Sequence, residues 1–180
     1  IKVILVCVSE DECYQLLGID FDGWTPLHDL REAGDTVSVR LVLNHINQDM
    51  RYSPLQMTND LSNTAPHLAT LRSRTDVMKV IHESVTQTQW INLLQMKGWE
   101  QMTVLQTAAY CNKQSSVDTI RDSVSDEKWI QLVSTPLPEY NQRIHHELEY
   151  KQAVSRIDEL RAAARVKYVL QTENNSGMLS

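Results

Sequence analysis

Thr25-Pro26-Leu27-His28 recurs in altered form as Thr64-Ala65-Pro66-His67 and as Thr103-Val104-Leu105-Gln106, and both intervals are 39 residues. Two other pairs of segments keep this interval, Ser84-Val85-Thr86 with Ser123-Val124-Ser125, and Trp90-Ile91-Asn92-Leu93-Leu94 with Trp129-Ile130-Gln131-Leu132-Val133. Self-similarity at a fixed period of roughly 20–50 residues is the sequence signature of a repeat protein. We therefore predict a repeat array over residues 1–136. Its parts are a partial repeat at 1–20 and repeats at about 21–59, 60–97 and 98–136.

Each repeat is expected to contain three helices. The first follows Thr25, Thr64 or Thr103, because a threonine hydroxyl at the N-cap accepts a hydrogen bond from a free backbone N–H. The second carries apolar residues at i, i+3 and i+7, which is one face of an α-helix. The three sets are Val39-Val42-Ile46, Met78-Ile81-Val85 and Val117-Ile120-Val124.

The third helix of each repeat is predicted from its polar caps, which are Ser9, Asn47, Thr86 and Ser125. Ser9 with Glu12, and Thr86 with Gln89, have the spacing of a capping box. Trp90 and Trp129 occupy equivalent positions in this helix, and we interpret both as core residues. Pro54 interrupts the corresponding segment of repeat 21–59, so that helix should be short or kinked.

Asp22-Gly23-Trp24-Thr25-Pro26-Leu27-His28, followed by Gly34-Asp35, resembles the ankyrin repeat. The resemblance implies that Gly23 permits a turn, that Thr25 caps the first helix and that His28 bonds a neighbouring repeat. It further implies a curved stack with a concave face that binds another protein. The later repeats depart from the pattern: the second has no glycine two residues before Thr64, and the third has Gln106 in place of the histidine.

The C-terminal part, residues 137–180, is expected to be a helical cap or extension. Residues 142–171 are predicted to form one long helix with Ile144, Leu148, Val154, Ile157, Leu160 and Ala164 on one side. Asn174 to Gly177 would end it. This helix could cap the last repeat or pair with another helix. The fold class predicted for the whole chain is all-α, an α-solenoid of ankyrin-like repeats with a long C-terminal helix.

Composition excludes several function classes. The formal net charge of the chain is −6, and residues 1–140 alone carry −7, which disfavours binding to a phosphate backbone. No segment is long and apolar enough for a membrane span, and no signal-peptide pattern is present. The three cysteines, Cys7, Cys13 and Cys111, are interpreted as reduced core residues of a cytoplasmic protein. The chain lacks an initiator Met and is expected to be a fragment.

No pattern of catalytic or metal-binding residues is expected to be functional. His145-His146-Glu147 has metal-ligand residue types, but Tyr150 stands where a His-Glu-x-x-His motif needs its second histidine. We interpret that segment as the solvated start of the last helix. The sequence contains no phosphate-binding loop and no nucleophile elbow. We therefore expect no enzyme activity, no cofactor and no metal.

The predicted function is a protein-binding scaffold, and the expected state is a monomer. The alternative is an assembly module driven by the C-terminal helix. If the ankyrin resemblance holds, turn residues and the ends of the first helices form a stripe on the concave face. Trp24 and Trp99 could instead pack on a neighbouring turn. The candidate binding residues are Phe21, Trp24, Glu32, Leu71, Arg72, Trp99, Met102 and Tyr110.

Overall fold

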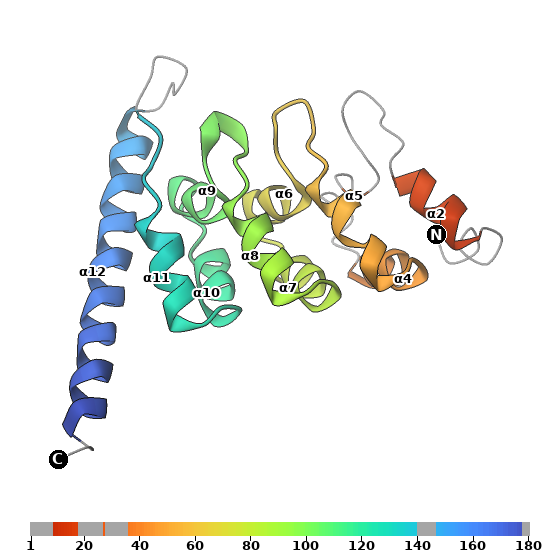
Figure 1. The fold of residues 1–180 in the computed structure, drawn as a ribbon. Helices are drawn as coiled ribbons and strands as arrows, with labels where there is room; N and C mark the ends of the chain where they lie inside the picture. Colours follow the sequence, from red (N-terminus) through yellow and green to blue (C-terminus); the bar gives the residue numbers. More distant parts are fainter. Residues whose placement is uncertain (1–8, 18–26, 28–35, 140–146, 178–180) are drawn as a thin grey trace.

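The computed structural model describes residues 9–17, 27, 36–139 and 147–177, and all regular secondary structure in these residues is helical. The prediction of an all-α protein is therefore confirmed for this part of the chain. The helices follow one another along the molecule, and the long C-terminal helix lies at one end (Figure 1).

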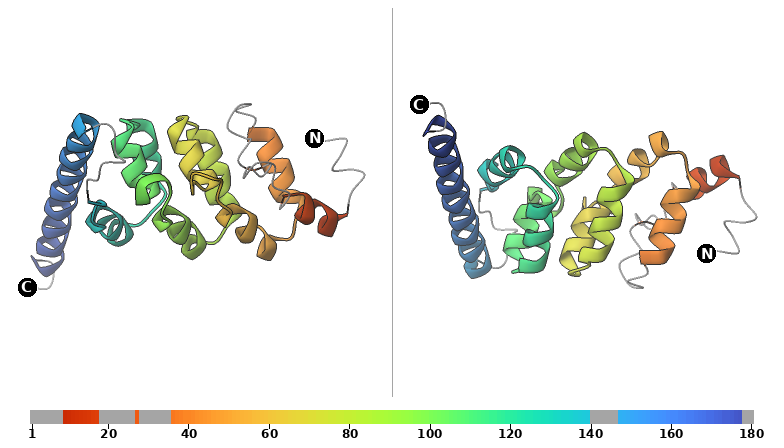
Figure 2. Two further views of the ribbon diagram at one scale, coloured as in Figure 1. Left: turned by 90° about the horizontal axis from the view of Figure 1, so that it is seen from above. Right: turned by 90° about the horizontal axis from the view of Figure 1, so that it is seen from below.

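The two units at 60–97 and 98–136 have the same make-up. The first contains α6 (Ala65–Leu71), α7 (Thr75–Ser84) and α8 (Gln87–Gln95). The second contains α9 (Val104–Tyr110), α10 (Gln114–Asp122) and α11 (Asp126–Ser134), preceded by the short 3-10 helix η2 (Trp99–Gln101). Their first and second helices lie side by side when the molecule is seen from above and below (Figure 2). Each of these two segments therefore contains the three predicted helices.

The predicted caps explain where these helices begin. The Thr103 hydroxyl accepts a hydrogen bond from the backbone N–H of Gln106 at 3.3 Å, and the Gln106 side chain accepts one from the Thr103 N–H at 3.0 Å. Thr86 and Gln89 form the same capping box at the start of α8. Each box satisfies two backbone N–H groups that a helix end otherwise leaves without a partner.

The unit at 21–59 has a shorter third helix, as Pro54 predicts. Its described elements are α4 (Thr36–His45), the 3-10 helix η1 (Gln48–Met50) and α5 (Tyr52–Gln56). Before them lies α2 (Glu10–Leu17), which starts at the predicted cap Ser9. The predicted cap Thr25 lies outside the described residues.

Two pairs of equivalent positions in the complete units take the left-handed conformation, and Glu100 takes it as well, with φ of 53°. Ser62 and Gln101 have φ of 62° and 60°, and Ser73 and Asn112 have φ of 56° and 54°. Ser62 and Ser73 each lie 39 residues after a glycine, Gly23 and Gly34 respectively. L-residues other than glycine adopt this conformation only at an energetic cost. The later units therefore keep the turn that a glycine would permit, although their sequences have lost the glycine.

The core runs through the units and contains both predicted tryptophans. The side chain of Trp90 is fully buried and that of Trp129 is 6% exposed. Five of the six second-helix residues in the two complete units are also buried, which confirms the predicted apolar faces; Val85 is partly buried. The first helices α6 and α9 are buried along their whole length except at their last residues, Leu71 and Tyr110.

Helix α12 (Glu147–Gly177) packs against α9 and α11 at the end of the row. Of the predicted apolar face, Ile157 and Ala164 are buried and Val154 and Leu160 are partly buried, whereas Ile144 lies outside the described residues; Ala153, which was not assigned to that face, is also buried. Leu148 was assigned to that face, but its side chain is 65% exposed. The helix also runs to Gly177, beyond the predicted end. Asn174 and Ser176 continue it because no glycine or proline interrupts the backbone before Gly177.

Candidate protein-binding surface

Four of the eight predicted binding residues are at the surface of the described structure. Leu71, Trp99 and Tyr110 are partly exposed, and Arg72 is exposed. We call these four residues the candidate recognition surface. The other four do not contribute to it: Met102 is buried, and three lie outside the described residues, namely Phe21, Trp24 and Glu32.

The assignment of Met102 to the binding face is wrong, because its side chain is fully buried. Its backbone explains this orientation. The Met102 N–H donates to the Trp99 carbonyl, and the Met102 carbonyl accepts from the Gly98 N–H at 2.8 Å. These bonds close the turn around η2 and leave the side chain in front of α9. Sequence spacing placed Met102 in the turn but could not give the direction of its side chain.

Trp99 and Tyr110 form an aromatic pair. Their ring centroids are 5.5 Å apart with an interplanar angle of 63°, the edge-to-face arrangement that aromatic rings favour. Trp99 comes from η2 and Tyr110 from the end of α9, so the pair joins the turn to the first helix of its own unit. Two large rings that are held against each other and remain partly exposed form a rigid apolar contact point.

The turn that carries Trp99 is fixed to the preceding unit. The Asn63 side chain accepts a hydrogen bond from the Trp99 backbone N–H at 3.0 Å. Gly98 makes this approach possible, since a Cβ there would lie 2.6 Å from Asn63 Oδ1 and 2.6 Å from His67 Cδ2. The position of Trp99 is therefore set by the packing of two units.

His67 supplies one of the hydrogen bonds between these two units. Its Nε2 lies 3.2 Å from the Met102 carbonyl, which can only accept, so Nε2 carries the proton. Its Nδ1 then accepts from the Thr64 hydroxyl at 2.8 Å. Burial disfavours the charged ring and lowers the pKa of His67 from 6.5 to about 4. This geometry agrees with the predicted role of a histidine that bonds a neighbouring repeat.

Gln106 occupies the position of His67 in the next unit, and its role was missed by the sequence analysis. Its amide nitrogen donates to the Thr135 carbonyl at 3.1 Å and to the Pro136 carbonyl at 2.8 Å. These bonds join α9 to the segment that follows α11 within the same unit, whereas the bond of His67 reaches the next unit. The spacing of 39 residues between His67 and Gln106 was the signal that could have identified it.

Helix α12 makes polar contacts with both ends of α11, and these were also missed. At the C-terminal end, the Arg161 guanidinium donates to the Val133 carbonyl and, at 2.9 Å, to the Thr135 carbonyl. At the N-terminal end, Lys167 Nζ lies 3.0 Å and Gln171 Nε2 2.8 Å from the Asp126 carboxylate. Cationic groups near a helix C-terminus and an anionic group at its N-terminus both suit the helix dipole.

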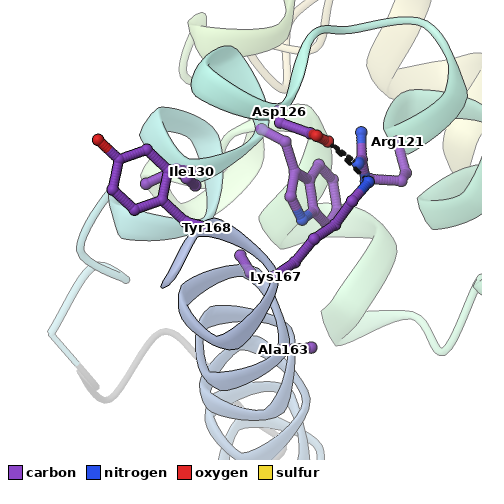
Figure 3. A pocket seen from close by; sticks show the side chains of 8 residues that line it. Arg121, Asp126, Ile130, Ala163, Lys167 and Tyr168 are labelled. Carbon is purple, nitrogen blue, oxygen red and sulfur yellow. Dashed lines mark hydrogen bonds and ion pairs between the residues drawn. The ribbon is translucent and has the colours of Figure 1, made fainter. Parts of the chain in front are cut away.

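Asp126 is the centre of a small cluster beside a cavity of about 120 Å³ (Figure 3). It pairs with Arg121 of α10 as well as with Lys167 of α12. Its bonds to Gln171, Lys167 and Arg121 lower the pKa of Asp126 from 3.8 to about 2. Arg121 also stacks over the Trp129 ring at 5.6 Å. Both cations of the cluster, Arg121 and Lys167, are paired with the Asp126 carboxylate. We therefore interpret the cluster as a structural contact and not as a binding site.

The described residues include neither an activated thiol nor a cluster of metal ligands. Burial raises the pKa of the Cys111 thiol, which keeps it protonated and unreactive at neutral pH. In the described part of the chain, no three histidine, cysteine or carboxylate side chains converge on a metal-sized site. His145 and His146 lie outside the described residues, as does Cys7.

No helix in the described residues has the length and hydropathy of a membrane-spanning segment. Comparison of the chain with protein-family models, curated proteins and solved structures found no match to any of them.

Proposed function

We propose that this chain is a protein-binding scaffold, an ankyrin-like solenoid that holds a partner protein on the candidate recognition surface, and that it is not an enzyme. The observation that carries the proposal is the Trp99–Tyr110 pair. Two aromatic rings stay partly exposed although their backbones are fixed by the Asn63 bond and by helix α9. Exposed rigid aromatic side chains are the residues that most often dominate binding at protein interfaces.

The repeated geometry supports the ankyrin-like part of the proposal. Left-handed residues follow the ankyrin-type glycine positions by one or two periods, and His67 bonds the next unit as the resemblance implies. In such an array, equivalent positions of successive units form a row. Leu71 and Tyr110 are equivalent and end the parallel helices α6 and α9. The row formed by these helix ends is the line along which a partner would lie.

The burial of α6 and α9 limits the residues of these helices that a partner can contact. Only the last residue of each helix reaches the surface, so a partner would contact the helix ends and the adjacent turns and not the length of the helices. Arg72 adds a charged group next to Leu71. A partner that fits is a protein segment with apolar side chains for the aromatic pair and a carboxylate for Arg72.

A paired substitution tests this function. Replacing Trp99 and Tyr110 together by Ala should reduce capture of specific partners from a cell lysate by at least tenfold. This follows because aromatic anchors of this type contribute about 2 kcal/mol or more each, and about 1.4 kcal/mol corresponds to a tenfold change in affinity. Quantitative mass spectrometry of proteins retained by the immobilised chain measures the change.

Leu148→Ala is the matched control, because it removes an exposed apolar side chain that does not belong to the candidate recognition surface. Partners should be lost with the double variant and kept with the control. Equal capture by the wild-type chain and the double variant, with helical circular dichroism unchanged, would rule out this surface as the binding site.

A further inference from the structure

The C-terminal half of α12 exposes an unusual amount of apolar surface. Of the seven large hydrophobic side chains that are exposed in the described residues, four fall within five consecutive positions of this helix. They are Val166, Tyr168, Val169 and Leu170, exposed by 61%, 52%, 50% and 55%. Such a concentration on one helix marks an interaction surface more often than chance exposure does.

Part of this surface lines a hollow between α11 and α12. The hollow has a volume of about 390 Å³, and Glu127 and Ile130 of α11 line it together with Arg165, Tyr168 and Val169 of α12. Spacings of i, i+3 and i+4 place the three α12 residues on one side of their helix, and Glu127 and Ile130 share one side of theirs. Tyr168 and Ile130 lie close together where the two helices meet (Figure 3).

The charges around the hollow are complementary to each other. One wall carries the carboxylate of Glu127 and the other wall carries the guanidinium of Arg165. Both side chains are exposed, and neither forms an ion pair with another residue of the described structure. The apolar residues lie between these two charges.

Such a surface matches a second copy of itself. In a two-fold symmetric interface, residue i of one chain contacts residue j of the other, and residue j of the first contacts residue i of the second. A rotation of 180° about an axis through the centre of the hollow places Glu127 of each copy opposite Arg165 of the other copy. The same rotation brings the apolar side chain of Ile130 of each copy against Tyr168 and Val169 of the other copy.

We propose that the chain forms a two-fold symmetric homodimer through this α11/α12 hollow, with two reciprocal pairs between Glu127 and Arg165 around an apolar centre. The proposal replaces the monomer expected from the sequence. It gives the C-terminal helix a second role beyond packing on the last unit. It is independent of the candidate recognition surface, because none of the dimer residues belongs to that surface.

Charge reversal tests the reciprocal pairs. Light scattering should give the wild-type chain a mass twice that of a single 20.7 kDa chain. Glu127→Arg brings arginine against arginine, and Arg165→Glu brings glutamate against glutamate, so each variant alone should be monomeric. Mixing the two variants should restore a dimer, since every cross-chain pair is then opposite in charge. The double variant E127R/R165E should also be a dimer.

Asp60→Arg is the matched control, a charge reversal at an exposed residue of the loop before α6, and it should stay dimeric. Val169→Asp should give a monomer by a different route, through the apolar centre. Circular dichroism checks that each variant is folded. W99A/Y110A should remain a dimer whether or not it binds a partner, which separates this proposal from the proposed function.

Three results would overturn the proposal. A wild-type chain that is monomeric throughout a dilution series excludes the homodimer, and the apolar surface would then bind a different protein. A dimer that persists in both single charge-reversal variants places the interface elsewhere. Single variants that are monomeric but fail to pair when mixed exclude the reciprocal contact.

Discussion

The interface between the two complete units and the interface between the last unit and α12 are both held by side-chain hydrogen bonds, but the groups that form these bonds differ. Between the units, the contacts are short and neutral: His67 bonds the Met102 carbonyl, and the Trp90 indole N–H donates to the Ser123 hydroxyl at 2.9 Å. At the end of the row, charged side chains of α12 bond backbone carbonyls, as Arg156 does with Ala109 at 2.7 Å and Arg161 with Thr135.

The difference follows from what each neighbour can offer. A further unit presents the same turn and the same helix end to its neighbour, so one set of short side chains can serve at each junction. A single straight helix presents only side chains, because its own backbone groups are already bonded within it. Its long arginine side chains reach the backbone carbonyls of Ala109, Val133 and Thr135 instead. The contacts at this end of the row therefore differ in kind from those between the two complete units.

The largest effect is expected from the two tryptophans at equivalent positions of these interfaces. Trp90→Ala should lower the free energy of unfolding by about 5 kcal/mol, and Trp129→Ala by about 3 kcal/mol, because both leave cavities in the core. The first change costs more, since Trp90 is fully buried and also loses its bond to Ser123. Urea denaturation followed by circular dichroism measures both values.

Trp90→Phe serves as a control that keeps an aromatic ring and removes the N–H, and a smaller loss of about 1–3 kcal/mol is expected. A loss below about 1 kcal/mol for Trp129→Ala would mean that α12 does not cover this residue in solution. The two interfaces would then differ in strength far more than their burial indicates.

Much of the fold could be predicted because the period fixes the register. Thr103, Thr86 and Ser9 were identified as caps from spacing alone, and their bonds depend only on residues three positions away. The short third helix of the first unit was predicted from Pro54, because the effect of a proline on a helix is also local. Hydrogen bonds between residues close in sequence can be predicted from that sequence, and a cap that recurs at a fixed interval is easier to recognise.

The contacts between units were harder to predict because they depend on side-chain direction and on partners far apart in sequence. Met102 was assigned to the surface but is buried, and Leu148 was assigned to a packed face but is exposed. The bond from Gln106 to Pro136 and the pair of Asp126 with Lys167 join residues that no period relates. Of the candidate site, the sequence identified Trp99 and Tyr110 separately, but only the structure shows their direct contact.

The second prediction uses pH to separate the contribution of His67 from that of Gln106, the residue at the equivalent position of the next unit. His67 has a pKa of about 4 in the folded chain and an ordinary value of 6.5 when unfolded, so protons bind the unfolded chain first. Its contribution to stability is complete above pH 6.5 and is lost as the pH falls towards 4. The loss is on the order of 3 kcal/mol. Denaturation at a series of pH values measures it.

His67→Gln provides the comparison, because it places at position 67 the side chain that occupies the equivalent position 106 of the next unit. Its amide can donate to the Met102 carbonyl as Gln106 does to Pro136. The difference in unfolding free energy between the wild-type chain and this variant isolates the histidine from other titrating groups. That difference should change with pH between 6.5 and 4. If it stays constant, the buried neutral histidine is not the linked group.

The smallest effect is expected where the later units have lost the glycines of the first. Ser62 and Ser73 hold a left-handed conformation that costs an L-residue about 1–2 kcal/mol, whereas glycine adopts it freely. Glycine also loses more backbone entropy on folding, by about 0.5–1 kcal/mol. Ser62→Gly and Ser73→Gly should therefore each raise the free energy of unfolding, by at most about 1 kcal/mol. Asn112→Gly should gain less, since asparagine tolerates this conformation better than serine does.

Ser155→Gly tests whether the gain comes from the backbone conformation. Ser155 is exposed in the middle of α12, where glycine should destabilise the helix by about 0.5 kcal/mol. The same substitution should thus have opposite signs in the turn and in the helix. A loss at Ser62 as well would mean that the serine side chain contributes more than the strain removes. The glycine positions of the first unit would then no longer explain the conformation of the turns in the units that follow.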